Sequence, residues 1–587
     1  MILVKTAMDA ELIGEEPAIL SGEWCRIFGH SDPRLFSLPV LSYHWDDRSK
    51  LARDAGYLAS LAERVLEALA DGLNEIHGTD FGTEYWRLLF GYWILQFVTV
   101  LWDRWEVLQS AVRSYPEIRT RIMTVPDHYA VPNGTADATR LFWQDAWNEH
   151  LFSSIVMHRT QLLFAEAVDP SRQPSSFIDP STTFSRLKKM RNHVPFLERC
   201  KNWYKKTRLR QAKWVIGAGG LPADIVRQLS QSLNRAPYAW PFPEEPMVPL
   251  ASDKRIWRLE LNGSNHFEEL LSELLPKYLP KVFLEGYSKL RVIARRFFPR
   301  HTVSGAFTLN AHFHSTVFKF WIAEQRERGA ILATAQHGGG AFHPLNSATE
   351  YEKRVSDIHG VTGNKNADAP NTVCVGRLNQ KLIPHARSQS GYMLVLQGLM
   401  PRYAFEIRSM PIAGQILSYF DDQFTFYSKL STKVRSHTRI RIYPKGDYGW
   451  NQLDRWLHAF PDVNLDLGES RLESMIRGAR LVVSTYNATT FNETLSANIP
   501  TVIFWNPNLW EISAEAEYYF AKLQEVKVFH VSPESASRHI CGVWKNVQEW
   551  WRSSAVQQAR EEYCDAFAKS DLEGLGRLVT ALNQGSQ

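Results

Sequence analysis

Cysteine is scarce in this chain, and neither sign of charge dominates. The five cysteines stand far apart in 587 residues, at Cys25, Cys200, Cys374, Cys541 and Cys564. This spacing fits neither a disulfide framework nor a zinc site, and it favours a reducing compartment. The formal net charge of +5 is too small for the dense basic stripe of a nucleic-acid-binding domain, so no nucleic-acid partner is expected.

Long apolar runs are also missing. Acidic residues stand near the N-terminus, where a secretion signal carries basic residues before an apolar stretch. The most apolar stretch, 88–102, contains Gly91 and Gln96 and is shorter than the roughly 20 residues of a membrane-spanning helix. We therefore predict a cytoplasmic protein with a buried helix at 88–102, and limit membrane contact to peripheral binding at the inner membrane.

The candidates for that peripheral contact are a basic, aromatic segment at 203–214 and three arginines, Arg291, Arg295 and Arg296. Basic side chains near a membrane surface are attracted to anionic lipid. The alternative is a helix face solvated by water, without membrane contact.

Signature motifs of several enzyme classes are absent as well. The chain has no Gly-x-Gly-x-x-Gly fingerprint, no Walker A loop and no Gly-x-Ser-x-Gly elbow, which leaves dehydrogenases, P-loop ATPases and α/β-hydrolases without support. No Asp-x-Asp triad follows an expected strand, because Asp46–Asp47 and Asp421–Asp422 are isolated pairs. We therefore predict that the protein uses no metal and no cofactor.

The chain is too long for one hydrophobic core, so we expect two or three domains. Residues 1–200 have apolar side chains at helical spacing, whereas strand and helix patterns alternate over 201–385 and again over 386–560. The polar segment 379–390 is the expected linker, and 561–587 is an expected C-terminal helix, able to pack back on the N-terminal half. The predicted fold class is α/β, with two Rossmann-like domains facing a cleft and a large helical N-terminal block.

The most informative pattern is a strand that runs into a hydroxyl-rich loop and a helix at 482–495. A helix N-terminus presents free N–H groups and the positive end of the helix dipole, which favour a bound phosphate. Helix capping is the alternative, but one cap does not account for so many polar residues. The predicted phosphate-binding and nucleotide-binding residues are Ser484, Thr485, Asn487, Thr489, Thr490 and Glu493.

A second pattern, Gln336–Gly340, places a histidine and three glycines at the end of an expected strand. Glycines let the backbone approach a ligand closely, and a histidine at such a bend can bind phosphate or act as a general base. We predict Gln336, Gly338 and Gly339 as phosphate-binding residues and His337 as the catalytic base. A tight turn with a solvent-facing histidine is the alternative.

Lys445 follows the expected strand 440–443 in a glycine-containing turn. A cation at the rim of a parallel sheet can neutralise the phosphate of a leaving group. We predict this phosphate-binding role for Lys445, with a solvated turn lysine as the alternative.

The N-terminal block carries charged residues beside tryptophans within apolar helices. Buried charges need partners, so one interpretation is a structural ion-pair network, for example between Asp103 and Arg87. The other interpretation is an acceptor site in which tryptophan faces pack on sugar rings. Its predicted residues are His44, Trp45, His77 and Trp86, with Glu84 and Asp46 as reserve candidates for the catalytic base.

These patterns resemble known proteins. The strand, hydroxyl loop and helix, with Asn498–Pro500 after them, look like the donor-binding half of GT-B glycosyltransferases. That resemblance implies that the loop holds the donor phosphate, that Glu493 holds the ribose and that no metal is required. Gln336–Gly338 is similar to elements of glycerophosphotransferases and surface-polysaccharide transferases, in which the histidine is catalytic or contacts phosphate.

Nearly the whole chain resembles a transferase family encoded in bacterial O-antigen and surface-polysaccharide clusters. The segments that carry the resemblance are 43–50, 73–77, 84–91, 103–104, 336–339 and 484–500. The family implies transfer of a sugar from a nucleotide sugar to a glycan or lipid-linked glycan acceptor. The chain departs from the expected pattern at Ala341–Pro344. Two alternatives stay open: a polyol-phosphate transferase, and a non-catalytic scaffold of a polysaccharide assembly complex.

Overall fold

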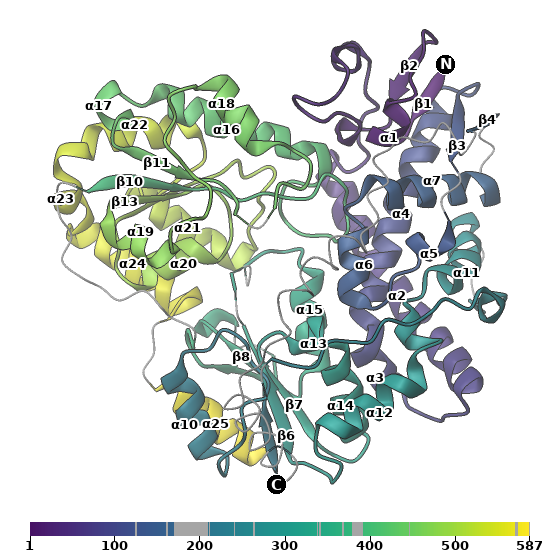
Figure 1. Ribbon diagram of the computed structural model, residues 1–587. Helices are drawn as coiled ribbons and strands as arrows, with labels where there is room; N and C mark the ends of the chain where they lie inside the picture. The colour runs from purple at the N-terminus through teal and green to yellow at the C-terminus, as the bar shows by residue number, and fades with distance from the viewer. Residues whose placement is uncertain are drawn as a thin grey trace, which may run out of the picture.

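The computed structural model arranges the chain in three regions that meet at the centre of the molecule (Figure 1). It describes residues 1–585 except 124–125, 160–162, 169–208, 210–211, 240, 262–264, 337, 340–341, 367–368, 379–390, 445 and 570–572. The expected linker and most of the basic segment 203–214 therefore lie outside the described residues.

The N-terminal block combines long helices with a small parallel sheet. Its strands pair in the order β2-β1-β3-β4. The sequence pattern predicts a mainly helical block and misses this sheet, because strands of three to six residues are too short to show a period. The strands are β1 (Ile2–Val4), β2 (Ala18–Leu20), β3 (Arg119–Met123) and β4 (Leu163–Val168), and the helices are α1 (Ala7–Ala10), α2 (Arg48–His77), α3 (Thr83–Trp86), α4 (Tyr92–Ser114), α5 (Asp127–Ala130), α6 (Thr135–Leu141) and α7 (Asp145–Arg159).

Local sequence explains the ends of the longest helix. At the start of α2, the Asp47 carboxylate accepts from the N–H groups of Ser49 and Lys50, which caps the helix. The helix ends at Gly78, whose φ of 61° is left-handed and suits glycine. The apolar stretch 88–102 forms a π-helical turn, Arg87–Gly91, and the buried start of α4, as predicted.

The middle domain is a parallel sheet in which the strands lie in chain order, β5-β6-β7-β8-β9. Its strands are β5 (Trp214–Ile216), β6 (Gly305–Thr308), β7 (Ile331–Ala335), β8 (Ile358–Val361) and β9 (Thr372–Cys374). The helices of this part of the chain are α10 (Ala223–Ser232), α11 (His266–Tyr278), α12 (Tyr287–Phe297), α13 (Ala311–His314), α14 (Thr316–Arg326) and α15 (Ser347–Val355).

The C-terminal domain is a parallel sheet in the order β12-β11-β10-β13-β14-β15. Its strands are β10 (Tyr392–Leu396), β11 (Thr438–Arg441), β12 (Leu465–Asp466), β13 (Ala479–Ser484), β14 (Thr501–Phe504) and β15 (Phe529–His530). Its helices are α16 (Ile416–Lys429), α17 (Thr432–Arg435), α18 (Gln452–Ala459), α19 (Leu472–Gly478), α20 (Thr489–Ser496), α21 (Ala514–Glu525), α22 (Pro533–Val543), α23 (Val547–Trp551) and α24 (Ser554–Phe567). The predicted α/β class with two Rossmann-like sheets is confirmed.

The last helix, α25 (Gly574–Gln584), leaves the C-terminal domain and packs on β8 and β9 of the middle sheet and on α10. Figure 1 shows it in yellow beside the teal strands. The chain therefore crosses between these two domains twice, once after β9 and once after α24.

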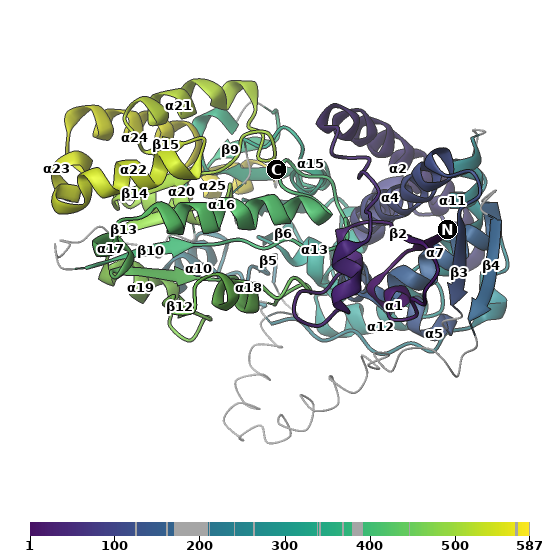
Figure 2. The ribbon, with the colours of Figure 1, turned by 90° about the horizontal axis from the view of Figure 1, so that it is seen from above.

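The hydrophobic cores divide the molecule unequally. One continuous core joins the N-terminal block to the middle domain, where α14 packs on α3 and α12. The C-terminal domain has separate core clusters. Seen from above, it lies opposite the N-terminal block, with α13 and α15 of the middle domain between them (Figure 2).

The segment 397–415 after β10 ties the C-terminal domain to the N-terminal block. Arg402 pairs with Asp145 of α7, and the buried Arg104 of α4 donates to the Ala404 carbonyl at 2.9 Å. This long loop therefore crosses from one region to the other at the carboxyl edge of the C-terminal sheet.

Candidate functional site

The strand order of the C-terminal sheet reverses beside β10. The chain continues from β10 to β11 and β12 on one side, and then crosses to β13, β14 and β15 on the other. In parallel α/β sheets, ligands bind outside the carboxyl ends of the strands at such a switch point. The loops that follow β10 and β13 are therefore the place to expect a ligand.

The helix that follows β13 starts without a side-chain cap. Ala488 occupies the N-cap position of α20 and makes no side-chain hydrogen bond to the helix. The preceding hydroxyls bind the protein itself: Thr485 donates to the Leu396 carbonyl at 3.0 Å, and Ser484 to the Tyr486 carbonyl at 3.4 Å. The prediction that Ser484 and Thr485 bind phosphate is therefore not supported, whereas the first turn of α20 presents its N–H groups to an anion.

The glycine loop of the middle domain packs directly on this helix start. The Gly339 N–H donates to Thr489 Oγ1 at 2.8 Å. A Cβ atom at Gly339 would lie 2.6 Å from the Ala488 carbonyl carbon, so only glycine fits here. At Gly338 the nearest atom to a Cβ would be Thr489 Oγ1, at 3.1 Å. Two loops from two different sheets thus meet at the N-terminus of α20.

Contacts on both flanks hold the glycine loop in place. Gln336 Oε1 accepts from the N–H and the hydroxyl of Thr362, at 2.9 and 3.0 Å, so its oxygen positions the loop. On the other flank, Phe342 is buried in an aromatic cluster of the C-terminal domain, and its carbonyl accepts from the Ser513 N–H at 2.8 Å. The loop is therefore a bridge between the two domains.

Two predicted residues of this site, His337 and Lys445, lie outside the described residues. Their roles as catalytic base and phosphate ligand stay predictions.

Glu493 lies one turn into α20 and pairs with an arginine from the middle domain. Its carboxylate is 3.0 Å from Arg377 Nη2. Burial lowers the pKa of Arg377, while the Glu493 side chain keeps 21% of its surface exposed and stays accessible to a ligand. The sequence prediction does not include Arg377, although a basic residue soon after the strand β9 is an available signal.

Asn487 and Thr490, two other predicted phosphate-binding residues at the start of α20, are buried. Asn487 has no exposed surface and contacts His343, the second residue after the undescribed part of the glycine loop. Burial lowers the pKa of His343 to about 4, so this ring is neutral at neutral pH. Thr490 is 7% exposed, and its hydroxyl lies 3.2 Å from the Tyr486 hydroxyl. Thr489 and Glu493 are thus the more accessible side chains of the predicted set.

A cavity of about 290 Å³ opens beside the same helix start. Its lining includes 486–488 before α20, 398–401 after β10 and most of 403–413. Its aromatic members are Tyr403, Phe405, Tyr443, Tyr448, Tyr486 and Trp510. Tyr403 and Trp510 are buried, whereas the other four rings are partly exposed and can stack on sugars and nucleobases.

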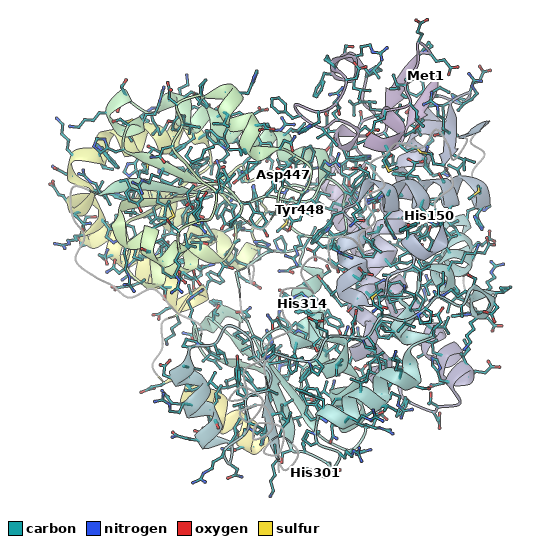
Figure 3. All side chains as sticks on the ribbon, in the orientation of Figure 1. Met1, His150, His301, His314, Asp447 and Tyr448 are labelled. Atoms are coloured by element: carbon teal, nitrogen blue, oxygen red, sulfur yellow. The ribbon has the colours of Figure 1, made fainter. Side chains whose placement is uncertain are left out.

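Tyr448 lines this cavity on a strained turn. Its φ is 52°, and Asn451 nearby has the same value, a conformation that costs about 1 kcal/mol or more for a residue with a side chain. Its ring lies 4.9 Å from that of Trp143 in the N-terminal block and 5.7 Å from Tyr443, centroid to centroid. Figure 3 shows Tyr448 where the C-terminal domain faces the other two regions. Contacts from two regions therefore hold the strained turn in place.

The sequence model of the LIC12162 family transferases matches residues 1–576. The chain belongs to this family of transferases. No curated protein sequence matches it.

Among solved structures, MurG of Acinetobacter baumannii is 12% identical, with 63% of this chain and 98% of that chain covered and a TM-score of 0.34. TarM is 11% identical over 50% of this chain and 57% of that chain, with a TM-score of 0.34. The pneumococcal O-GlcNAc transferase GtfA, solved with UDP and GlcNAc, is 11% identical over 50% and 59%, with a TM-score of 0.32. These TM-scores lie under 0.5, and the fold assignment rests on the strand order of the transferase itself.

The tryptophans predicted for the acceptor site of this transferase belong to its core. Trp45 and Trp86 have no exposed surface, and their indole N–H groups donate to Asp54 and Asn74. Neither offers a face to a sugar, so this prediction is corrected: they are large apolar side chains that fill the core. His77 Nε2 donates to the Phe283 carbonyl at 2.9 Å, and its ring stacks on a tyrosine ring.

The charged residues of the block form ion pairs, but with other partners than the sequence suggests. His44 Nε2 lies 3.1 Å from Asp103 Oδ1, and Asp103 also pairs with Arg104. Arg87 pairs with Glu84 and Glu63, at 2.9 and 2.7 Å. The network interpretation therefore holds, without the pair between Asp103 and Arg87.

The two reserve candidates for the catalytic base, Glu84 and Asp46, lie in different parts of the molecule. Gly82, two residues before Glu84, lies near Glu327 at the C-terminal end of α14. That end is the amino edge of the middle sheet, so Glu84 is remote from the glycine loop and is not supported as a base. Asp46 is exposed and accepts from Gln415 Nε2 at 3.0 Å, at the start of α16.

The described part of the chain offers neither a metal site nor a membrane span. No group of three or more His, Cys, Asp or Glu side chains there could hold a metal ion, and no helix there is long and apolar enough to span a bilayer. Arg291 and Arg295, two candidates for lipid contact, both pair with Glu324, at 2.6 and 2.7 Å. Arg296 is exposed.

Proposed function

We propose that this transferase moves a sugar from a nucleotide-activated donor to a surface-polysaccharide or related glycoconjugate acceptor, without a metal. The observation that carries the proposal is the hydrogen bond from Gly339 to Thr489. It brings a loop from each of two parallel sheets to the uncapped start of α20, beside an aromatic cavity. Helix N-termini bind phosphate and aromatic rings pack on sugars, so both parts of a nucleotide sugar have a matching surface.

Each part of the donor is assigned a place in this proposal. The phosphates bind the first turn of α20, where the helix dipole stabilises the negative charge that grows as the sugar leaves. The ribose binds Glu493, whose carboxylate Arg377 holds in position. The sugar occupies the aromatic cavity, and Lys445 completes the phosphate site. His337, predicted as the base, takes in this proposal the phosphate-binding role that a histidine at such a bend can also have.

The proposed location is the cytoplasm, with peripheral contact at the inner membrane. Of the three candidate arginines, Arg291 and Arg295 are already paired with the Glu324 carboxylate. Arg296 is exposed and supports such contact, since a basic side chain near the surface is attracted to anionic lipid. A lipid-linked glycan would then reach the site from the membrane surface.

A thermal-shift panel of CMP, CDP, UDP, GDP and ADP tests the donor site. Stabilisation by one nucleotide is expected, because a ligand present at 100 times its Kd adds about 2.7 kcal/mol to the free energy of unfolding. If none of the five nucleotides raises the Tm, the result would contradict the proposal and favour a non-catalytic scaffold. The mass of the product then separates sugar transfer from polyol-phosphate transfer, since only the second adds phosphorus.

A further inference from the structure

The carboxyl edge of the middle sheet carries polar side chains that the donor site does not use. The short helix α13 follows β6, with Asn310 at its N-cap position and His314 at its last position. β6 lies beside β7, the strand that leads into the glycine loop. This corner, residues 310–316, is therefore at the same edge of the sheet as the glycine loop.

A chain of contacts connects the corner to the aromatic cavity. The ring of Phe313 in α13 packs on Tyr92, with centroids 4.9 Å apart. Tyr92 donates its hydroxyl to Glu406 Oε2 at 2.7 Å, and Glu406 lines the cavity. The corner and the donor site are thus linked through a small number of side chains.

The side chain of Asn310 at this corner has an unused hydrogen-bond acceptor. Asn310 Oδ1 is buried and has no hydrogen-bond partner within the described ranges, although an N-cap side chain normally caps its helix. His312 is 0% exposed and its Nε2 lies 3.3 Å from the Glu352 carboxylate, so this ring is not available to a ligand. Buried polar groups in proteins are normally paired, so the buried oxygen of Asn310 indicates a ligand that donates a hydrogen bond to it.

His314 is the accessible member of the corner. It is exposed, and Figure 3 shows it on the side of the middle domain that faces Asp447 and Tyr448 of the C-terminal domain. The His314 N–H donates to the Asn310 carbonyl at 3.3 Å, so the two residues lie one turn apart.

The surroundings of His314 keep its ring uncharged. Although part of His314 is exposed, the protein packed around it removes water from its ring. This desolvation, with smaller effects from His312 and the Lys319 ammonium, lowers the pKa of His314 to about 4. A neutral imidazole has an unprotonated nitrogen that can accept a proton at neutral pH.

We propose that this corner binds a hydroxyl group of the acceptor and that His314 is the catalytic base that removes its proton. The inference rests on the proposed sugar transfer. The acceptor oxygen forms a bond to the anomeric carbon of the donor sugar while the bond from that carbon to the donor phosphate breaks. The phosphate leaves with the electron pair, and the hydroxyl proton passes to the unprotonated ring nitrogen of His314.

The unused groups also indicate the class of acceptor. Asn310 Oδ1 and the unprotonated nitrogen of His314 both accept hydrogen bonds. A ligand must therefore bring donors, as a sugar hydroxyl does and a phosphate does not. Lys319 offers no counter-charge, because it is 2% exposed and donates to Thr135 Oγ1 at 3.0 Å. The reacting part of the acceptor is thus a neutral, hydroxyl-bearing glycan.

The direct test compares His314→Gln with the matched control His301→Gln. His301 is exposed too, but it lies at the opposite end of the middle domain (Figure 3). We expect His314→Gln to lose sugar transfer by about 100-fold or more and to keep the stabilisation by nucleotide. His301→Gln should keep both. Transfer by His314→Gly should recover when imidazole is added.

Transfer by His314→Gln within about threefold of the wild-type rate, or no recovery of His314→Gly with imidazole, would overturn the role of His314. A wild-type protein that no nucleotide stabilises would instead contradict the proposed donor site, so the two failures can be told apart.

A second measurement needs no transfer. NMR spectra of the full chain with ¹³C-labelled histidines report contacts at the His314 ring, which the His314→Gln variant assigns. Methyl glucoside, a neutral hydroxyl probe, should shift the His314 resonance, and inorganic phosphate should not. A shift with phosphate alone would overturn the assignment of a neutral acceptor.

Discussion

The middle and C-terminal domains both contain a parallel sheet, but the two sheets are organised differently. In the middle sheet the strands β5 to β9 lie side by side in chain order, whereas the C-terminal sheet reverses between β10 and β13. A reversal sends the loops on its two sides in opposite directions and opens a crevice, and the aromatic cavity lies there. The C-terminal sheet therefore has its own binding crevice, and the middle sheet supplies groups that reach toward it.

The two carboxyl edges also differ in chemistry. The edge at α20 offers N–H donors and the positive end of a helix, which suit an anion. The edge at α13 offers a buried amide oxygen and a neutral imidazole, which suit a hydroxyl. In the proposed function, this difference divides the donor from the acceptor between the two sheets.

Substitution of the glycine that joins the two edges should have the largest effect. A methyl group at Gly339 would lie 2.6 Å from the Ala488 backbone, so Gly339→Ala must push the loop away from α20. We expect transfer to fall by about 1000-fold or more, which corresponds to ~4 kcal/mol, and nucleotide stabilisation to be lost. Steady-state kinetics and thermal shift measure both.

Gly338→Ala is the matched control. The nearest atom to its methyl group would be the Thr489 hydroxyl at 3.1 Å, a side-chain atom that can rotate. We expect a loss of tenfold or less, on the order of 1 kcal/mol. Equal losses in the two variants would show that the close backbone approach at Gly339 is unimportant.

Replacement of the buried Lys319 tests whether burial lowers the pKa of this ammonium group, which lies near the carboxyl edge of the middle sheet. Burial lowers the pKa of Lys319 to about 7, below its value of about 10.4 in an unfolded chain. Between these values the unfolded state binds more protons, so stability rises with pH, and the cost of burying the charge is fully present below pH 7. Lys319→Met should therefore be more stable than wild type below pH 7, by a few kcal/mol, with a difference that shrinks toward pH 10.

Calorimetry of both proteins from pH 6 to pH 10 measures this difference, and the exposed Lys289 provides the control in Lys289→Met. A constant offset between Lys319→Met and wild type over this range would contradict the lowered pKa. Because the Lys319 charge also lowers the pKa of His314, the acid limb of the rate should move to higher pH in Lys319→Met.

The salt bridge between the two domains should give the smallest effect. Glu493→Gln removes the charge that pairs with the buried Arg377 but keeps an oxygen that can accept its hydrogen bond. This should cost about 1–2 kcal/mol of stability and reduce the stabilisation by nucleotide. Arg48–Glu511, with 2.6 Å between its charged atoms, also links two regions. Glu511→Gln should therefore lower the Tm while leaving the nucleotide effect unchanged, and a reduced nucleotide effect in both variants would refute a ribose site at Glu493.

Much of the strand and helix order follows from the sequence where an element is buried and regular. The apolar pattern of the sequence predicts strands at 392–396 and 330–335, and the structure has β10 at the first and β7 within the second. The pattern also predicts a helix at 411–430. That helix begins later, at Ile416, because the residues before it belong to the loop that crosses to the N-terminal block. The expected strand 440–443 is β11, which lies two residues earlier, at Thr438–Arg441.

The site was predictable only where one continuous segment carries it. Thr489 and Gly339 each stand in a recognisable loop, and local pattern suffices to find them. The aromatic cavity draws on segments from 398 to 510, and no local period links such residues. The prediction for Trp45 and Trp86 was wrong because the local sequence of a tryptophan beside a charged residue is the same whether the ring is buried or exposed.

Amide hydrogen exchange of the wild-type transferase, with and without the nucleotide that stabilises it most, tests the division between the two sheets most directly. Nucleotide should slow exchange in peptides that cover 486–493, at the start of α20, and leave 305–316, at the β6–α13 corner, unchanged. Protection of 305–316 without protection of 486–493 would contradict the account, because the donor would then bind the middle sheet.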